Sequence, residues 1–460
     1  SRPTAPQPRP TGSRAPSRIR LAHAPAYHLA SKTPAGGIPA PPYAMSFIIA
    51  APSSGSGKTT LTLGLLRALR RREVPVRAAK SGPDYIDPRF HEAACGHPCL
   101  NLDAWAMTDT RIRSLSAGPV PLVIEGAMGL FDGAPPDGKG STADLARMLG
   151  LRVVLVIDAG KMAGSIAPLA KGFIQHDRAV VIAGVILNNV GSPRHETMLR
   201  RALGDIPVLG AVPRTATLTH PSRHLGLVQA QERPDLEVFL NDAADLIDAN
   251  CDIAALQALL QPMPSHANSS RRQPPAQRIA VAQDAAFAFT YPHLLQDWQD
   301  AGATLQVFSP LANDPVPASD LVYLPGGYPE LYAGQLAANN RFFSTLRASQ
   351  ALIYGECGGY MILGETLTDR YGVVHQMAGL LALETSFATR KLHLGYRDLA
   401  ASQGAFRGKS KGHEFHYATT TKALGDPLFE AQDAEGNHLS PMGLIHNNVS
   451  GSFAHIIDQA

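Results

Sequence analysis

The sequence predicts an α/β fold with two successive domains, each built on a parallel sheet. In the first half, short apolar runs rich in β-branched residues alternate with helical stretches, which is the pattern of a parallel sheet covered on both faces. These runs lie at residues 47–51, 122–124, 153–157 and 180–187. A Pro-, Ser- and Arg-rich stretch at residues 262–277 has the composition of a linker. A second α/β pattern begins with the apolar run at residues 278–282.

These patterns divide the chain into a leader, two domains and the linker. We expect the first domain at residues 45–261, closed by a helix at residues 236–260, and the second at residues 278–460. Residues 1–44 contain no Asp or Glu, and their Pro-, Ser-, Ala- and Arg-rich composition predicts disorder. We interpret this leader as a disordered tail or an extended gene start ahead of Met45, with an organellar transit peptide as the alternative.

Composition and charge indicate a soluble, cytoplasmic protein that binds neither membranes nor nucleic acid. Of the 460 residues, 45% are hydrophobic and 17% are charged, and no stretch approaches the roughly 20 apolar residues of a membrane-spanning helix. The net charge is +3, but without the leader it is about −3, so the folded part lacks the basic surplus of a nucleic-acid-binding domain. Four cysteines in a chain of this length predict a reducing compartment without a disulfide framework.

A glycine- and serine-rich loop separates the first apolar run from the helical stretch at residues 59–70. Its candidate nucleotide-binding residues are Gly55, Gly57, Lys58, Thr59 and Thr60. Small residues let backbone N–H groups approach a phosphate, the lysine adds a charge for the β- and γ-phosphates, and the Thr59 hydroxyl is suited to ligate Mg²⁺. Pro52 stands where the strict pattern has glycine, so we predict a variant of the nucleotide-triphosphate loop.

Acidic residues follow the predicted strands beside this loop. They are Asp84, Asp87, Glu125 and Asp158. Each alone could cap a helix or form a turn, but the carboxyl ends of parallel strands face one crevice, and carboxylate oxygens suit Mg²⁺. We therefore predict a metal–nucleotide site at this edge of the sheet. Asn188 follows the run at residues 180–187 and could read the adenine edge, with a plain turn residue as the alternative.

The second domain contains a cysteine at a predicted strand-to-helix turn. The run at residues 351–354 leads into Gly355-Glu356-Cys357-Gly358-Gly359, an arrangement in which flanking glycines permit a strained turn that exposes a nucleophile. We expect the N-terminus of the following helix to lower the pKa of the Cys357 thiol. Upstream, Gly326 and Gly327 form another turn suited to offering backbone N–H groups to an oxyanion. A structural cysteine is the alternative.

A cysteine nucleophile needs a base, and three histidines in the last part of the chain are candidates by residue type. They are His413, His416 and His455. The spacing of His413 and His416 also suits a metal site, but no further Cys or His cluster stands nearby in the sequence. Residue type alone leaves the choice among the three histidines open.

Taken together and in this order, the motifs resemble those of the cobyrinic/hydrogenobyrinic acid a,c-diamide synthases. Besides the phosphate loop and the Cys357 turn, the similar segments are residues 82–88, 125–133, 223–227 and 324–330. The resemblance extends from about Ser46 to the C-terminus. It implies a P-loop, dethiobiotin-synthetase-like ATP-binding amidoligase domain, followed by a class I glutamine amidotransferase domain with a flavodoxin-like α/β fold.

The resemblance also implies roles for individual residues. Lys58 and Thr59 would serve ATP and Mg²⁺, and Tyr85 and Ile86 would lie beside the corrinoid. The residues that would serve the metal and the activated carboxylate are Asp84, Asp87 and Glu125. Of these, Asp84 and Glu125 would be the metal ligands, together with Thr59. Cys357 would be the glutaminase nucleophile, and His455 would raise its nucleophilicity. The family's second histidine, two residues further on, is Ile457 here, so we expect a Cys–His dyad without an orienting carboxylate after the histidine.

The implied reaction is an ATP-dependent amidation of the a- and c-carboxylates of a corrinoid, with glutamine as the nitrogen source. ATP would convert each carboxylate into an acyl phosphate. Ammonia released from glutamine at Cys357 would pass through an internal channel and attack this acyl phosphate. The partners would be the corrinoid dicarboxylate, glutamine and ATP, with Mg²⁺ as the cofactor. Whether the chain forms a homodimer stays open.

Two further choices depend on the resemblance. The segments at residues 102–107 and 67–72 are more similar to the enzymes that use metal-free hydrogenobyrinate than to those that use cobalt-bearing cobyrinate. One alternative function is that of cobyric acid synthase, which amidates other corrinoid side chains. Another is a P-loop partition or maturation ATPase that has lost its glutaminase, but an intact Cys357 and the paired Asp84 and Asp87 argue against it.

Overall fold

The computed structural model describes residues 46–215, 222–223, 226–227, 229–260, 263 and 272–459. The leader predicted at residues 1–44 lies outside these described residues, as do most of the predicted linker and residues 224–225 of the motif at residues 223–227. No helix in the described part is long and apolar enough to cross a membrane.

The apolar runs of the N-terminal half form a seven-stranded sheet in the order β3-β2-β4-β1-β5-β6-β7, and every neighbouring pair is parallel. The strands are β1 (Phe47–Ala50), β2 (Arg77–Ser81), β3 (Leu100–Leu102), β4 (Leu122–Glu125), β5 (Val153–Asp158), β6 (Ile182–Val190) and β7 (Val208–Pro213). Every residue of β1 and β4 is buried, which explains why these strands are apolar without alternation. The parallel sheet predicted for this half is confirmed.

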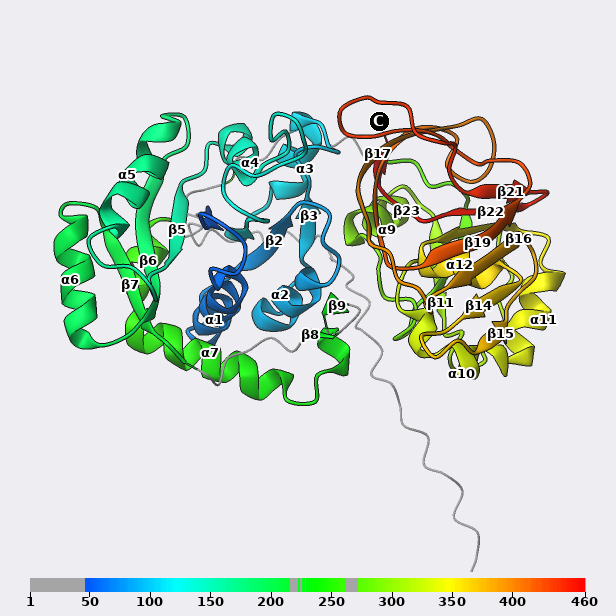
Figure 1. Ribbon diagram of the computed structural model, residues 1–460, viewed down its shortest axis with the longest axis horizontal. Coiled ribbons are helices and arrows are strands. Elements are labelled where there is room, and N and C mark those ends of the chain that lie inside the picture. Colours follow the sequence, from blue (N-terminus) through cyan, green and yellow to red (C-terminus); the bar gives the residue numbers. More distant parts are fainter. Residues whose placement is uncertain are drawn as a thin grey trace, which may run out of the picture. The chain divides into compact units, whose positions relative to one another are not determined.

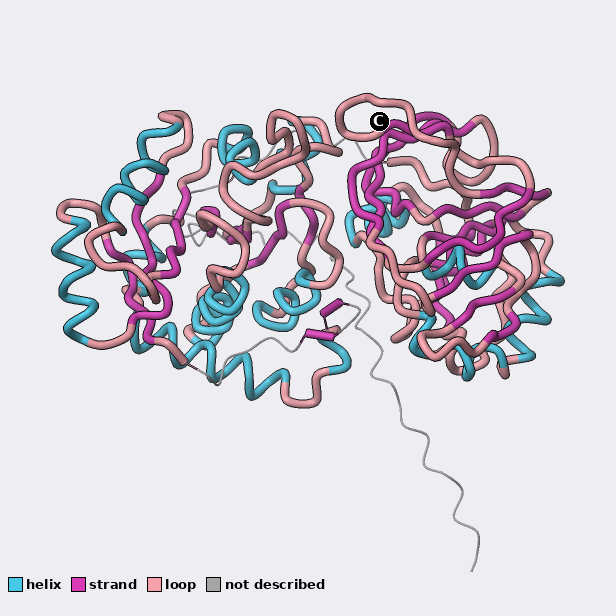
Figure 2. The backbone as a smooth tube through the Cα atoms, in the orientation of Figure 1, coloured by secondary structure: helices cyan, strands magenta, loops and turns pink. Residues whose placement is uncertain are grey.

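Helices connect these strands, and Figure 2 shows them flanking the sheet. They are α1 (Lys58–Arg71), α2 (Asp87–Cys95), α3 (Asp109–Ser116), α4 (Thr142–Leu149), α5 (Ile166–His176), α6 (Pro193–Leu203), α7 (Leu236–Asn250) and α8 (Ile253–Ala258). Helix α1 packs against both α2 and α7 (Figure 1). The short elements β8 (Ser222–Arg223), β9 (Gly226–Leu227) and η1 (Ala230–Glu232) precede α7.

The continuous helix predicted at residues 236–260 is wrong, because the chain breaks between α7 and α8. Cys251 has an extended backbone and forms a bridge with Gly210 of β7. Asp252 then begins a new helix, since its carboxylate accepts a hydrogen bond from the Ala255 N–H at 2.9 Å. Apolar periodicity alone does not reveal a break whose cause is pairing with a distant strand.

The C-terminal half contains a six-stranded sheet in the order β11-β10-β12-β13-β22-β21. The strands are β10 (Arg278–Ala282), β11 (Thr304–Phe308), β12 (Leu321–Leu324), β13 (Leu352–Glu356), β21 (Leu444–His446) and β22 (Val449–Ser452). All pairs are parallel except β21 with β22. The helices are α9 (Pro292–Asp300), η2 (Pro329–Leu331), α10 (Ala333–Ala337), α11 (Asn340–Ala348) and α12 (Gly358–Leu363). This agrees with the second α/β domain predicted from the sequence.

Two further four-stranded sheets, in the orders β15-β14-β16-β19 and β20-β17-β18-β23, were not predicted. Their strands are β14 (Thr366–Thr368), β15 (Val374–Gln376), β16 (Ala382–Ser386), β17 (His393–Ala401), β18 (Gly408–His416), β19 (Thr419–Leu424), β20 (Glu430–Gln432) and β23 (Ala454–Gln459). In the second of these sheets, Tyr396 lies opposite His413, and His413 lies opposite His455. Directly opposed residues share a face of a sheet, so the three rings form one cross-strand row.

Buried ion pairs connect α3 to the C-terminal half. The Arg111 guanidinium donates to the Asp297 carboxylate of α9 at 3.2 Å and to the Asp458 carboxylate of β23 at 3.1 Å. Arg272 donates to the same Asp458 side chain at 2.6 Å. Because the Arg111 side chain is only 1% exposed and that of Asp458 is fully buried, each of these charges depends on its partners for compensation.

Candidate active site

The phosphate loop connects β1 to α1, and glycine shapes it. Gly57 has a φ of 88°, and a Cβ atom there would lie 2.2 Å from Nδ2 of Asn188, so a larger residue would displace that amide. Lys58 Nζ donates to the carbonyl of Met128 at 2.6 Å and to that of Ser53 at 3.4 Å. The lysine predicted to contact phosphates therefore rests on backbone oxygens around the loop.

Two other residues predicted for the nucleotide site have surroundings that differ from the prediction. Asn188 lies inside β6, which continues to Val190, and its Nδ2 donates to the Ser56 carbonyl at 3.0 Å. It therefore supports the phosphate loop, and the adenine contact stays a prediction. Asp158, at the end of β5, is exposed and accepts a hydrogen bond from the Gly160 N–H at 2.9 Å. Asp158 therefore stabilises the turn after β5, which was the alternative to a role in the metal–nucleotide site.

Glu125, at the end of β4, is the centre of a buried polar network. Thr59 Oγ1 donates to its Oε1 at 2.6 Å, and Lys80 Nζ lies 2.9 Å from the same oxygen. His91 Nε2 lies 2.5 Å from the other oxygen, Oε2. Burial alone would raise the pKa of Glu125, but Lys80 and His91 together hold it well below its ordinary value. Glu125 is therefore ionised, and it joins α1, β2 and α2 beside the phosphate loop.

Asp84 and Asp87 extend this network along the segment between β2 and α2. Lys80 Nζ also lies 2.7 Å from Oδ2 of Asp87, so one ammonium group bridges Asp87 and Glu125. Asp84 Oδ1 accepts hydrogen bonds from the N–H groups of Ile86 at 2.8 Å and Asp87 at 3.2 Å. Burial, followed by the charge of Asp87, raises the pKa of Asp84 to about 7. Asp84, Asp87 and Glu125 are called the carboxylate cluster below.

Lys80 and His91 were not predicted as site residues from the sequence. A signal for Lys80 was present, because it is a charged residue between the small residues Ala79 and Ser81, and charged residues are rarely buried without a partner. His91 lies four residues after Asp87 on α2, so both face the same side of that helix. Nothing in the local sequence, however, predicts that this face meets the end of β4.

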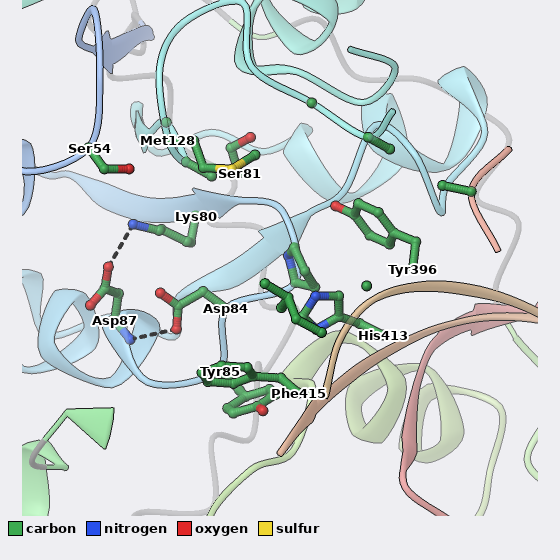
Figure 3. Close-up of a pocket in the computed structure, with 18 of the residues that line it drawn as sticks. Ser54, Lys80, Ser81, Asp84, Tyr85, Asp87, Met128, Tyr396, His413 and Phe415 are labelled. Carbon is green, nitrogen blue, oxygen red and sulfur yellow. Dashed lines mark hydrogen bonds and ion pairs between the residues drawn. The ribbon is translucent and has the colours of Figure 1, made fainter. Parts of the chain in front are cut away.

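A cavity of about 1060 Å³ opens beside the phosphate loop. The predicted site residues that line it are Gly55, Lys58, Thr59, Asp84, Tyr85, Ile86, Asp87 and Glu125, whereas Gly57, Thr60 and Asn188 do not. The C-terminal half contributes Tyr396, Arg397, His413, Phe415 and Tyr417, of which only His413 was a predicted site residue. Figure 3 shows Lys80, Asp84 and Asp87 around the same space as Tyr396 and His413. Both halves of the chain therefore form this cavity.

Cys357 lies at the turn between β13 and α12. Its φ of 46° and ψ of −104° belong to a region that residues with side chains rarely adopt, as a nucleophile turn requires. A Cβ atom on Gly359 would lie 1.9 Å from the Leu324 carbonyl oxygen, so glycine is needed there. Cys357 and Gly327 line one small cavity. The turn has the geometry predicted from the sequence.

The predicted effect of α12 on the Cys357 thiol is wrong in this structure. Burial raises the pKa of the thiol well above its ordinary value, and the charge of Glu330 adds to this. The Gly358 N–H at the start of α12 acts in the opposite direction but does not outweigh desolvation. A six-residue helix has a weak dipole, and Cys357 is only 3% exposed. The thiol therefore needs a base or a change in its surroundings to ionise.

His455, on β23, is brought to the same place as Cys357. A Cβ atom on Gly326 would lie 2.1 Å from Cε1 of His455 and 3.2 Å from Cβ of Cys357, so both side chains lie against this glycine. Burial, followed by the charges of His413 and His416, lowers the pKa of His455 to about 3. The imidazole is therefore neutral, which is the form that can accept a proton.

A carboxylate that was not predicted from the sequence lies beside His455. Oε2 of Glu356 is 3.7 Å from His455 Nδ1, accepts a hydrogen bond from the Tyr323 hydroxyl at 2.8 Å, and comes from the residue before Cys357 rather than after the histidine. Burial raises the pKa of Glu356 to about 8, so the group is mostly protonated at neutral pH. The expected dyad therefore has a third, neutral neighbour.

The other two histidine candidates have different surroundings. His413 lines the larger cavity, and burial followed by the charge of Arg397 lowers its pKa to about 4. His416 Nε2 lies 2.9 Å from Glu414, and with His393 these residues form a cluster of metal-ligating types. The rings of His393 and His416 are stacked at 4.6 Å with an interplanar angle of 4°, so their in-plane lone pairs do not converge on one point. This geometry speaks against a metal site there.

Comparison with known families covers both halves of the chain. Residues 47–228 match the CobQ/CobB/MinD/ParA nucleotide binding domain, and residues 278–460 match the CobB/CobQ-like glutamine amidotransferase domain. The two domain types predicted from the sequence are therefore confirmed. Among solved structures, the septum site-determining protein MinD of Pyrococcus horikoshii, complexed with Mg-ADP, is similar to 47% of this chain and 94% of its own, at 17% identity and a TM-score of 0.28. At this TM-score, the similarity says nothing about the function of this chain.

Curated relatives match nearly the whole chain. It is 54% identical over 428 residues to the hydrogenobyrinate a,c-diamide synthase of Brucella abortus biovar 1, covering 90% of this chain and 98% of that protein. It is 50% identical over 428 residues to the protein of the same name from Sinorhizobium sp, with the same coverage. The protein of that name from Rhodobacter capsulatus is 50% identical over 425 residues, covering 89% and 98%.

Proposed function

Because this chain belongs to the hydrogenobyrinate a,c-diamide synthase family, we propose that it converts the a- and c-carboxylates of hydrogenobyrinate into carboxamides. ATP would be the phosphoryl donor, and glutamine would be the nitrogen source. The observation that carries the proposal is the larger cavity, where the phosphate loop and the carboxylate cluster meet side chains of the amidotransferase half. A site of about 1060 Å³ is large enough for a bulky substrate beside a nucleotide.

The first chemical step activates a carboxylate, which is a poor electrophile at neutral pH. A carboxylate oxygen of the corrinoid attacks the γ-phosphorus of ATP, and the bond to the β-phosphate oxygen breaks, giving an acyl phosphate and ADP. Lys58 would exchange its bonds to the Met128 and Ser53 carbonyls for phosphate oxygens. Positioning and charge stabilisation supply most of the catalysis in such transfers.

The carboxylate cluster suits a divalent cation. Thr59 offers a hydroxyl oxygen, and Asp84 and Glu125 offer carboxylate oxygens, which are the hard ligands that Mg²⁺ prefers. Glu125 is held ionised by Lys80 and His91, as a ligand must be. When bound, Mg²⁺ neutralises charge on the transferring phosphoryl group. Lys80 already bridges Asp87 and Glu125 with a positive charge, so it would remain as a second source of neutralisation.

The second site would release ammonia from glutamine. The Cys357 proton passes to His455, and the thiolate attacks the amide carbon. The carbon–nitrogen bond then breaks, the nitrogen takes the proton from His455 and leaves as ammonia, and a glutamyl thioester remains. Water hydrolyses the thioester to glutamate and restores the thiol. The Gly327 backbone borders the cavity at Cys357, where an oxyanion would form.

Ammonia completes the reaction at the acyl phosphate. Its lone pair forms a bond to the acyl carbon, the bond to the phosphate oxygen breaks, and phosphate leaves with a proton from the nitrogen. Repetition at the other carboxylate gives the a,c-diamide, two ADP, two phosphate and two glutamate molecules.

The test is product analysis with two substrates. The protein is incubated with ATP, Mg²⁺ and glutamine, and with either hydrogenobyrinate or cobyrinate, and amidations are counted by mass spectrometry. We expect two amidations of hydrogenobyrinate. A parallel incubation contains the a,c-diamides of both compounds, and amidation of these diamides alone would instead indicate the cobyric acid synthase reaction. ATP hydrolysis without any amide product would overturn the proposal.

A further inference from the structure

Two cavities of the described part of the chain share a wall of aromatic side chains. The larger one, of about 1060 Å³, borders the carboxylate cluster, and the smaller one, of about 20 Å³, borders Cys357. Tyr85, Phe415 and Tyr417 line both. Because a side chain that borders two cavities lies between them, these three residues separate the site that would release ammonia from the site that would use it. Figure 3 shows Tyr85 and Phe415 among the residues around the larger cavity.

Tyr85 is the member of this wall that contacts the glutaminase pair. Its ring stacks on Phe289 with centroids 4.3 Å apart and lies 4.7 Å from the His455 ring. Within the described residues, neither the Tyr85 hydroxyl nor either ring nitrogen of His455 has a hydrogen-bond partner. The tyrosine is therefore held by ring packing alone, and it covers the histidine that should take the Cys357 proton.

The cavity at Cys357 is closed to substrate in this structure. A volume of about 20 Å³ has room for about one water molecule, far too little for glutamine. Cys357 and His455 are 3% and 0% exposed. Glutamine can therefore reach the thiol only after some of the surrounding side chains move, and Tyr85 is one of those that line the closed space.

Tyr85 is also directly connected to the carboxylate cluster. It lies between Asp84 and Ile86, and the Asp84 carboxylate accepts hydrogen bonds from the N–H groups of Ile86 and Asp87. A corrinoid carboxylate entering the cluster must compete with Asp84 for space and charge, so it would disturb the turn that orients Tyr85. The same residue thus contacts the acceptor site on one side and the ammonia-producing site on the other.

We propose that Tyr85 couples the two sites: corrinoid binding in the larger cavity moves its ring away from His455, which opens the smaller cavity to glutamine and the aromatic wall to ammonia. This inference rests on the proposed function. A ligand can shift such an equilibrium only by binding one state better, and the corrinoid does so because the displaced ring leaves room against Asp84 and Ile86. The aromatic wall also keeps the passage free of water, which would protonate ammonia and remove its lone pair.

The experiment measures how far glutamine hydrolysis depends on the corrinoid. Glutamate and corrinoid carboxamide are quantified for the full chain with ATP, Mg²⁺ and glutamine, with and without hydrogenobyrinate. Tyr85→Ala removes the ring, whereas Tyr85→Phe keeps the ring and removes only the unpaired hydroxyl. Tyr371→Ala is the control for loss of an aromatic ring, because Tyr371 is 74% exposed and lines neither cavity.

In the parent protein, we expect the corrinoid to stimulate glutamine hydrolysis on the order of tenfold, a typical size for coupling between sites. Tyr85→Phe keeps the ring against His455, so its ratio of stimulated to unstimulated hydrolysis should stay close to that of the parent, while the KM for the corrinoid reports any lost contact with the substrate. One glutamate should then accompany each carboxamide. Tyr85→Ala should hydrolyse glutamine without the corrinoid and release several glutamates per carboxamide. Phe415→Ala, which removes another ring that lines both cavities, should also lower the yield of carboxamide per glutamate, so that the conclusion does not depend on one variant.

Two outcomes separate failure of the inference from failure of the proposed function. If the parent protein makes the diamide and Tyr85→Ala retains its corrinoid stimulation and its yield of carboxamide per glutamate, the coupling role of Tyr85 is overturned while the function stands. If the parent protein makes no carboxamide from any corrinoid, the proposed function itself fails. Circular dichroism of each variant checks that the fold is retained.

Discussion

His413 lies directly opposite His455 where β18 and β23 pair, yet the two rings have different surroundings. His413 lines the larger cavity, whereas His455 is fully buried against Gly326 and Cys357. His416 lines the smaller cavity together with Cys357, but its Nε2 lies 2.9 Å from a carboxylate oxygen of Glu414. Geometry therefore favours His455 as the partner of the thiol, a choice that residue type alone left open.

This choice predicts different effects of the two opposed histidines. His455→Asn should lower glutamine-dependent amidation by about 100-fold or more, since a positioned general base contributes about 10²–10⁴-fold. His413→Asn should cause a smaller loss, chiefly as a higher KM for the corrinoid. Steady-state kinetics check this, with glutamine varied in one series and the corrinoid in another, and the reverse order of effects on glutamine-dependent amidation would make His413 the base.

Cys357→Ser tests the separation of nitrogen supply from carboxylate activation. A hydroxyl is a far weaker nucleophile than a thiolate near neutral pH, so glutamine-dependent amidation should disappear. High ammonium at alkaline pH should restore amide formation, because the carboxylate cluster needs only ammonia. Lys58→Ala is the matched control and should lose amidation with either nitrogen source. Retained glutamine-dependent activity in Cys357→Ser would mean that this residue is not the nucleophile.

Gly326→Ala should inactivate the glutaminase without disturbing ATP chemistry. The new Cβ would lie 2.1 Å from Cε1 and 2.9 Å from Nε2 of His455, so the ring must move away from Cys357. Gly334→Ala, in α10, is the control, because its Cβ would meet only His375 at an ordinary contact distance of 3.6 Å. Glutaminase and ammonium-dependent amidation are measured for both. Equal glutaminase activity in the two variants would show that the ring is not held against Gly326.

Glu356 predicts a pH dependence of stability. Its pKa is raised from 4.5 to about 8 by burial, so between these values the folded protein holds a proton that the unfolded chain has released. This contribution to stability is lost as pH rises through that window, by at most about 1.4 kcal/mol per pH unit. Glu356→Gln lacks the titration, so its thermal midpoint should fall less between about pH 6 and pH 8 than that of the parent. If the thermal midpoints of Glu356→Gln and the parent changed equally with pH, the raised pKa of Glu356 would be contradicted.

Arg111 should be essential to the joint between α3 and the C-terminal half. Arg111→Met leaves Asp297 and Asp458 without its charge in a buried site, which should cost about 3–5 kcal/mol. Arg113→Met, on the same helix, breaks only the exposed pair with Asp109 and should cost about 1 kcal/mol or less. Denaturant unfolding of both variants makes the comparison. Similar unfolding midpoints of the two variants would mean that the charges of Asp297 and Asp458 are compensated by water or by rearranged side chains when Arg111 is removed.

Local sequence was enough to predict the phosphate loop, the acid at the end of β4 and the turn at Cys357. Each depends on a few adjacent residues whose backbone demands are strict, such as the positive φ of Gly57 and the crowding at Gly359. A buried parallel strand followed by a helix also places its last residue at the crevice, whatever the rest of the chain does. The α/β class followed from the alternation of buried strands and helices, whereas both domain types were implied by the resemblance to the a,c-diamide synthases.

The tertiary structure alone decided which distant groups meet. Lys80 and His91 reach Glu125 only because β2, α2 and β4 pack together, and Glu356 reaches His455 only because β23 returns beside β13. The high pKa of the Cys357 thiol and the contact between Tyr85 and His455 arise in the same way. Desolvation and ring packing depend on everything that surrounds a side chain, whereas turn geometry and strand polarity depend on its neighbours along the chain.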